Sequence, residues 1–305
     1  MLNLRFGRHA LGIGVAILLL AGCGGTQSQL SPPVPVAHNA ITAETSAIHP
    51  NSATIILVGT GWVSPQGIAV DGKGNVYVSD YQLGEVRKVS PPFTGRTHGK
   101  IRVVAQGLDS PTRVALDGNG NVYVLAGGTI LQITPSGVKN TVATLAAFGI
   151  AADASQDVYA AADKNLYFIR HKPRGGWEAP VKIGPGFSDA TEVARDVQGN
   201  LYIVDSGVNG VKKLEPSGKL LTVGSGFIGL EGVAIPLGCK ATCSVYVSDA
   251  DHNAVKKVSP PFKGPTHGKI TNIGYGFSGP LGVAARGTDV YVVDGGNVQV
   301  KEVIP

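Results

Sequence analysis

The sequence is poor in several features that would mark other classes of protein. Charged residues make up 15% of the chain, and there are three cysteines, one methionine and two tryptophans. The formal net charge is +5, and two of these charges, Arg5 and Arg8, lie in the first 22 residues, which hold no acid. The remaining charge, about +3, is too small and dispersed to predict a nucleic acid partner. The apolar run at residues 10–20 is too short to span a bilayer as a helix.

Motifs of common hydrolases are also missing. The chain contains no Gly-x-Ser-x-Gly elbow and no His-Glu-x-x-His sequence. The segment at 117–121, Asp-Gly-Asn-Gly-Asn, begins like a calcium-binding loop, but Val122 stands at its sixth position and Gly128 at its twelfth, where Gly and Glu are needed. This segment therefore predicts a hairpin turn.

The N-terminus has the layout of an export signal: two arginines, an apolar run and a stretch of small residues. The sequence Leu20-Ala21-Gly22-Cys23 resembles the lipobox of bacterial lipoproteins, which implies cleavage before Cys23 and lipidation of its thiol. An ordinary signal peptide that happens to contain a cysteine is the alternative. We expect residues 1–22 to be a lipoprotein signal peptide. Gly24 after the cysteine favours the outer membrane if the cell is Gram-negative.

Residues 23–53 are predicted to form a lipid-bearing tether. The stretch is rich in Gly, Ser, Pro and Ala and shows no sustained strand or helix period, so it lacks the apolar surface needed to fold. The two cysteines outside it, Cys239 and Cys243, stand four residues apart. In an exported protein this spacing predicts a local disulfide and does not fit a zinc site.

One unit recurs six times in residues 54–305. Each copy has a short Val/Ile-Ala strand, a polar turn and a second strand centred on a tyrosine; the six tyrosines are Tyr77, Tyr123, Tyr159, Tyr202, Tyr246 and Tyr291. They are 46, 36, 43, 44 and 45 residues apart. A third strand follows in each copy and a fourth in the first five, and no segment has a helical period long enough to compete. Four short strands every forty residues or so predict a six-bladed, all-β propeller.

The chain ends predict how the ring closes. The last copy stops after its third strand, at 298–303, and an unassigned apolar strand at 54–58 precedes the first copy. An N-terminal strand that completes the last blade would remove an exposed sheet edge. This arrangement requires six blades.

The repeats resemble NHL repeats. Residues 64–71, Ser-Pro-Gln-Gly-Ile-Ala-Val-Asp, and 74–80, Gly-Asn-Val-Tyr-Val-Ser-Asp, carry the similarity, which extends over 54–305 and is weakest in the third copy. The resemblance implies the propeller fold, and it assigns no catalytic residue.

Two sets of loops are expected to form the mouth of the channel. The loops that lead into the first strands bring Gln66, Arg113, Thr191, Glu192 and Glu231. Those after the second strands bring Asp80, Asp205, Asp249, Asp251, His252 and Asp294. Each aspartate has a second interpretation as a turn residue whose carboxylate caps local N–H groups. Arg113, Glu192 and Glu231 stand where the repeat otherwise has small residues. Arg195, a charge inside a first strand, requires a partner such as Glu192 or Asp196.

The sequence favours a binding or scaffold module of the cell envelope. It has a complete fold without a complete catalytic constellation, so the expected partner is a protein, peptide or glycan, bound by a monomer without a cofactor. The membrane would be contacted only through the lipid. The alternative is an enzyme of the lactonase or virginiamycin B lyase type, which the chain resembles only through propeller repeats. In that case Glu192 and Glu231 would bind a divalent metal and His252 would act as a base.

Overall fold

The computed structural model describes residues 53–240, 242–262 and 267–305. The signal peptide, Cys23 and nearly all of the tether predicted from the sequence lie outside these ranges. In the described part no helix is long and apolar enough to cross a membrane.

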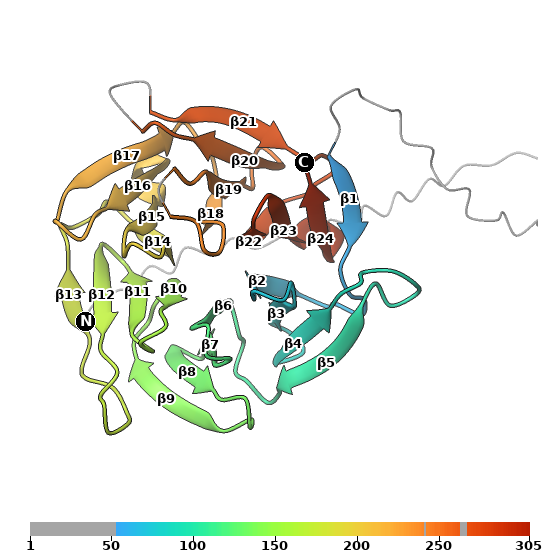
Figure 1. The fold of residues 1–305 in the computed structure, drawn as a ribbon, viewed down its shortest axis with the longest axis horizontal. Coiled ribbons are helices and arrows are strands. Elements are labelled where there is room, and N and C mark those ends of the chain that lie inside the picture. Colours follow the sequence, from blue (N-terminus) through green and yellow to red (C-terminus); the bar gives the residue numbers. More distant parts are fainter. Residues whose placement is uncertain (1–52, 241, 263–266) are drawn as a thin grey trace, which may run out of the picture. The chain divides into compact units, whose positions relative to one another are not determined.

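Six four-stranded antiparallel sheets surround a central axis (Figure 1). Blade 1 is β2 (Pro65–Val70), β3 (Val76–Asp80), β4 (Glu85–Ser90) and β5 (Lys100–Ala105). Blade 2 is β6 (Arg113–Leu116), β7 (Val122–Ala126), β8 (Thr129–Ile133) and β9 (Lys139–Thr144). Blade 3 is β10 (Gly149–Ala152), β11 (Val158–Ala162), β12 (Asn165–Ile169) and β13 (Val181–Ile183).

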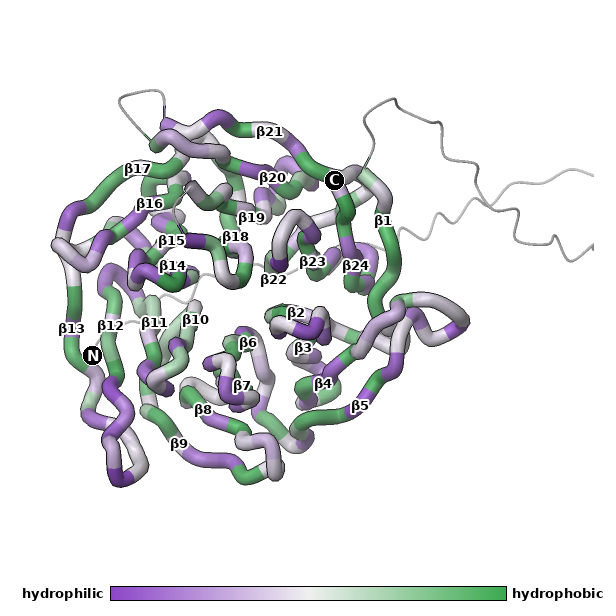
Figure 2. Tube along the Cα trace, in the orientation of Figure 1, coloured by the Kyte–Doolittle hydropathy of each residue, from purple (hydrophilic) through white to green (hydrophobic). Residues whose placement is uncertain are grey.

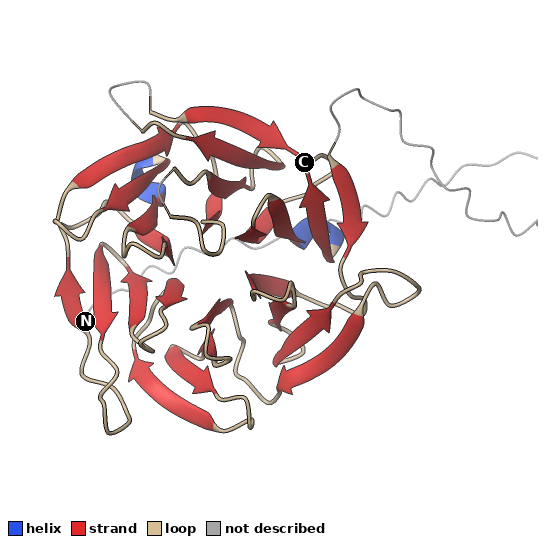
Figure 3. Cartoon of the chain, in the orientation of Figure 1, coloured by secondary structure: helices blue, strands red, loops and turns tan. Residues whose placement is uncertain are grey.

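The second half of the ring repeats this order. Blade 4 is β14 (Ala190–Arg195), β15 (Leu201–Asp205), β16 (Gly210–Leu214) and β17 (Leu220–Ser225). Blade 5 is β18 (Leu230–Ala234), β19 (Val245–Asp249), β20 (Ala254–Ser259) and β21 (Lys269–Ile273). Blade 6 is β22 (Pro280–Arg286), β23 (Asp289–Asp294), β24 (Gln299–Ile304) and β1 (Thr54–Leu57). Two short 3-10 turns, η1 (Ser206–Val208) and η2 (Gly295–Asn297), are the helical segments of the described residues (Figure 3).

The ring closes as the sequence predicted. Strand β1 pairs antiparallel with β24, with Thr54 opposite Ile304 and Leu57 opposite Lys301. The N-terminal strand is thus the outer strand of the last blade, and the free edge of β24 is covered.

The core lies between the blades. Six clusters of buried apolar side chains each join two neighbouring blades, for example Val78 of blade 1 with Val293 of blade 6. Hydrophobic residues occur in the strands of every blade, and the outer strands β5, β9 and β21 mix hydrophobic with polar residues (Figure 2). Because each face of a sheet packs against the next blade, second strands such as Val122–Ala126 are buried throughout.

The repeated tyrosine has a structural role in the first four blades. Its hydroxyl donates to the aspartate of the hairpin that precedes it, as from Tyr77 to Asp71 at 3.3 Å and from Tyr202 to Asp196 at 3.2 Å. The same aspartate accepts backbone N–H groups of its own turn, such as those of Lys73 and Asn75. The aspartate and tyrosine of the repeat therefore form a side-chain hydrogen bond that links the second strand to the hairpin before it.

Candidate functional site

The innermost strands approach one another so closely that four blades have glycine at one aligned position. This position lies two residues before the alanine that pairs with the repeated tyrosine, and its glycines are Gly67, Gly149, Gly232 and Gly282. A Cβ at Gly67 would lie 2.6 Å from the carbonyl oxygen of Thr112 in the next blade. Blades 2 and 4 carry Arg113 and Glu192 there instead.

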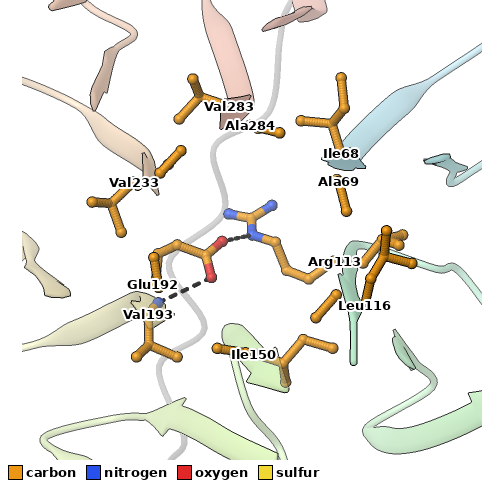
Figure 4. Close-up of a pocket in the computed structure, with 18 of the residues that line it drawn as sticks. Ile68, Ala69, Arg113, Leu116, Ile150, Glu192, Val193, Val233, Val283 and Ala284 are labelled. Atoms are coloured by element: carbon orange, nitrogen blue, oxygen red, sulfur yellow. Dashed lines mark hydrogen bonds and ion pairs between the residues drawn. The ribbon is translucent and has the colours of Figure 1, made fainter. Parts of the chain in front are cut away.

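Arg113 and Glu192 meet in the channel. Nε of Arg113 lies 2.6 Å from Oε2 of Glu192, and the two side chains are only 13% and 10% exposed (Figure 4). The Nε–H does not point along this contact, so Nε has no hydrogen-bond acceptor although it is buried. Oε1 of Glu192 accepts the N–H of Val193 at 3.0 Å. The pair spans blade 3, where a Cβ on Gly149 would overlap with Glu192.

Glu231 completes a charged cluster at the mouth. Arg113 Nη2 lies 3.4 Å from Oε2 of Glu231 and donates to its backbone carbonyl at 3.2 Å. The Glu231 side chain is 41% exposed, far more than its two partners. One guanidinium therefore joins blades 2, 4 and 5, with one carboxylate buried and the other open to solvent.

Glu192 is a buried carboxyl group whose pKa is raised. Burial raises its pKa from 4.5 to about 7, against the opposing effects of Arg113 and of the Val193 N–H. The nearby carboxylate of Glu231 adds to the rise. A carboxyl group with such a pKa exchanges a proton near neutral pH.

A pocket of about 560 Å³ lies against this cluster, and Arg113 and Glu231 form part of its lining. Besides Arg113 it is lined by Thr112, Phe148, Thr191 and Glu231, which precede the aligned inner position in blades 2 to 5, and by Ala147, Ser206, Asn209, Gly229 and Leu230. Phe148 is 48% exposed, and Val208 and Ile228, next to lining residues in the chain, are exposed to a similar extent. The hydroxyl oxygen of Thr191 is buried without a hydrogen-bond partner. Polar groups thus line the pocket together with an apolar wall.

The sequence predicts Arg113, Thr191 and Glu231 at the mouth but not the other seven lining residues of this pocket, among which Phe148 is the exposed aromatic side chain. Phe148 occupies the repeat position of Gln66, Thr191 and Glu231, so the alignment of the repeats held the signal. The sequence prediction was based on charged and polar residues, and an aromatic side chain does not stand out by that criterion. Gln66 itself lies in blade 1, outside this pocket, and its amide contacts the hydroxyl of Ser64 at 3.4 Å.

The aspartates after the second strands hold the mouth loops in place. Asp80, Asp205, Asp249 and Asp294 are buried, and one carboxylate oxygen of each accepts a backbone N–H from the loop that leads into the same blade, whereas Asp251 is exposed. The bonds run from Ser64 to Asp80, from Asp189 to Asp205, from Ile228 to Asp249 and from Ser278 to Asp294, at 2.7–3.0 Å. Lys256 and Lys301 also bind Asp249 and Asp294, each at 2.5 Å. Asp205 and Asp249 therefore position loops of blades 4 and 5, which contribute to the pocket, and Asp80 and Asp294 hold the corresponding loops of blades 1 and 6.

His252 lies beside one of these aspartates. Its Nδ1 is 2.9 Å from Oδ2 of Asp249, and its side chain is 43% exposed. Burial acts to raise the pKa of Asp249, but hydrogen bonds from Lys256 and His252 outweigh it and lower the pKa. In the described structure His252 bonds to Asp249 and makes no contact with the Arg113 cluster.

Arg195 is paired differently from the sequence expectation. Its Nη2 lies 3.4 Å from Oδ2 of Asp153 in blade 3, and its guanidinium covers the ring of Tyr159. With Asp196 it shares only a bond to the backbone carbonyl, at 3.4 Å. The carboxylate comes from the neighbouring blade. The sequence pattern could not predict that Asp153 would lie beside Arg195.

The cluster does not fit a divalent metal. Arg113 contacts both Glu192 and Glu231, so a cation bound by these two carboxylates would meet a fixed positive charge. Among the described residues no group of three or more His, Cys, Asp or Glu side chains is placed to hold a metal ion. Elsewhere, Cys239 and Cys243 form a disulfide with a Cα–Cα distance of 5.8 Å, on the loop between β18 and β19.

Comparisons with known proteins support the fold. No protein-family model matches the chain, and no curated protein matches it in sequence. The chain is similar in structure to an auxiliary nutrient binding protein from Bacteroides ovatus, with a TM-score of 0.63 and 12% identity over 83% of this chain and 77% of that one. A similar protein from Bacteroides thetaiotaomicron gives a TM-score of 0.62 and 10% identity over 83% and 76%.

An inactive variant of virginiamycin B lyase from Staphylococcus aureus, solved with quinupristin, gives a TM-score of 0.56. It shares 15% identity, and the match covers 83% of this chain and 89% of that one. These neighbours include binding proteins and enzymes on one architecture. At such low identities they establish the propeller fold, and function has to be argued from the site.

Proposed function

We propose that this protein is a binding module and that its ligand is a peptide segment held at the mouth of the channel. The observation that carries the proposal is the 560 Å³ pocket, in which exposed Phe148 faces solvent beside the Arg113–Glu231 pair. A pocket of this size, with an apolar wall and several placed polar groups, suits one or two side chains of a ligand. The nutrient-binding neighbours are consistent with a binding role for such a propeller.

The charges favour a ligand with a hydrogen-bond donor. Arg113 is engaged by Glu192 and Glu231, while Glu231 remains 41% exposed and its Oε1 has no partner among the described residues. An amine, a guanidinium or an amide N–H of the ligand would donate a hydrogen bond to this oxygen. The apolar wall of Phe148 and Leu230 would take an adjacent apolar side chain.

The test is selection of random displayed peptides on the full chain, followed by titration of selected peptides against variants. Phe148→Ser and Glu231→Gln should each weaken binding by about tenfold or more, since each removes roughly 1.4 kcal/mol or more of contact energy. Val197→Ser is the control, because Val197 is 56% exposed on a hairpin at the other end of the blades. Failure to select any peptide, or equal losses in all three variants, would exclude this proposal.

An enzyme of lyase type is the second candidate, and the pKa of Glu192 favours it. A buried carboxyl group with a pKa of about 7 can serve as a general base at neutral pH. The metal-dependent version of this hypothesis does not fit the Arg113 cluster. Activity on a cyclic ester or lactone that is abolished in Glu192→Gln, without added metal, would establish the second candidate over the first.

We also propose that the module is exported and anchored through Cys23, as a monomer. The support is the Leu-Ala-Gly-Cys sequence and the paired Cys239 and Cys243, which suit an oxidising compartment. Two or three acyl chains give a stable anchor, whereas one is marginal. The full chain should therefore partition with membranes, and Cys23→Ser should release it to the soluble fraction. An unchanged distribution in that variant would exclude lipid anchoring at this residue.

A further inference from the structure

A second cavity lies between blades 1 and 2, at the other end of the strands from the mouth pocket. Its volume is about 680 Å³. Blade 1 contributes Lys73, Tyr77, Lys88 and Arg102 to its walls, and blade 2 contributes the hairpin 118–120 and the turn 134–137. It shares no residue with the mouth pocket.

The blade 1 wall is a row of three side chains on one face of the sheet. Tyr77 on β3 is directly opposite Lys88 on β4, which is directly opposite Arg102 on β5. Nζ of Lys88 lies 5.3 Å from the centroid of the Tyr77 ring. Lys73, on the hairpin before Tyr77, adds a third positive charge to the cavity.

Two like charges directly opposite each other destabilise a sheet, and blade 1 is the one blade that has them at this position. The corresponding pairs of blades 2 to 6 are Gln132 with Asn140, Phe168 with Val181, Lys213 with Leu221, Lys257 with Thr271, and Glu302 with Ile56. In blade 4, Lys213 has a carboxylate 3.5 Å away, that of Glu215. No carboxylate of the described residues forms an ion pair with Lys73, Lys88 or Arg102.

The one acid in the cavity, Asp71, is already bonded. Its Oδ2 accepts from the Asn75 amide at 2.7 Å and from the Tyr77 hydroxyl, and its Oδ1 accepts the backbone N–H of Lys73 and of Asn75. Three cations therefore face a cavity whose single carboxylate is held by its own turn. Apolar side chains, among them Val104, Leu116 and Leu237, form another part of the wall, beside Asn119, Thr134 and Ser136.

We propose that the cavity between blades 1 and 2 binds a small organic dianion, with its phosphate or carboxylate groups at Lys88 and Arg102 and its apolar body against Val104 and Leu116. The bound anion would relieve the repulsion between Lys88 and Arg102, and Lys73 would approach it from the rim. Charge-assisted hydrogen bonds of this kind are among the stronger polar contacts. The proposal is independent of the function proposed for the mouth pocket.

The test is calorimetric titration of the full chain with phenyl phosphate, which joins a dianionic group to an apolar ring. Saturable binding is expected, and Lys88→Gln and Arg102→Gln should each weaken it by about tenfold or more. Lys257→Gln is the matched control, because Lys257 stands opposite Tyr246 at the same position of blade 5 and lines no part of the cavity. Lys88→Arg should retain binding, which separates loss of charge from damage to the fold.

Titration with inorganic phosphate, which has no apolar ring, tests the contribution of the apolar wall separately from that of the charges. Inorganic phosphate should bind at least tenfold more weakly than phenyl phosphate if the apolar wall contributes. Equal affinity for the two would overturn the assignment of the apolar body. Absence of saturable phenyl phosphate binding, or an equal loss in the Lys257→Gln control, would overturn the site itself.

Discussion

Arg113 and Glu192 belong to blades 2 and 4, yet their side chains meet at 2.6 Å across blade 3. They meet because Gly149 occupies the aligned position of blade 3 and leaves the space that Glu192 fills. The aligned inner positions of the six blades thus hold four glycines and one ion pair, which pack together around the axis. The charged cluster under the mouth pocket depends on this packing.

The stability of the protein should depend on pH through Glu192. Its pKa is about 7 in the fold and 4.5 without burial, so the folded state binds the extra proton between these values. The resulting stabilisation is fully present below pH 4.5 and is lost as pH rises through 7, by up to about 3 kcal/mol. Urea unfolding of the protein and of Glu192→Gln at pH 5 and pH 8 measures the difference. The protein should lose stability relative to the variant at pH 8, and a constant difference would contradict the pKa.

Removing Arg113 should destabilise the protein more at high pH than at low pH. Arg113→Met leaves the buried carboxylate of Glu192 without its cation, at a cost of about 3 kcal/mol when it is ionised. At pH 5 the carboxyl group is protonated and the cost should be smaller. The double variant Arg113→Met, Glu192→Gln should recover most of the loss at pH 8. Additive effects of the two substitutions would show that the side chains do not interact.

Gly149→Ala should be strongly destabilising although glycine is usually dispensable in a strand. The added Cβ would overlap with the Glu192 backbone and carboxylate, and overpacking of this kind costs about 1–3 kcal/mol. Gly72→Ala is the control, since its Cβ would meet only Leu237, at 4.0 Å, and its stability should change by no more than about 0.5 kcal/mol. Thermal and urea unfolding compare the two, and equal effects would argue against the close approach of β10 and β14.

Closure by β1 should be essential to a monomeric ring. Replacing Ile55 and Ile56 by proline removes at least one ladder hydrogen bond to β24 and exposes its edge, so the melting midpoint should fall and aggregation should increase. Val197→Pro is the control, because Val197 lies second in a turn that tolerates proline and donates no described backbone bond. Size-exclusion chromatography and thermal melting would reveal both effects. A stable monomer in the doubly substituted chain would contradict the role of β1.

Several parts of the fold could be predicted from local pattern. The tyrosine spacing predicted six blades, and the incomplete last copy predicted that residues near 54–58 would close the ring. The aspartates were harder, because Asp205, Asp249 and Asp294 suit both a ligand and a turn. The structure shows their oxygens bonded to the loops before the first strands. Those loops lie 16 to 21 residues earlier in the chain, beyond the reach of a turn motif.

The sequence by itself determined the number of blades, the order of strands and the strand that closes the ring, because alternation, turn residues and repeat spacing are local properties of the chain. Tertiary structure alone decided which charges meet. Arg113 and Glu231 are separated by 118 residues and become neighbours only when the ring closes. The pairing of Lys88 with Arg102 likewise became significant only when blade 2 enclosed it in a cavity. The repeat pattern specifies the strands and turns of each blade. Which residues of different blades come into contact depends on how closely the inner strands approach one another at their glycines.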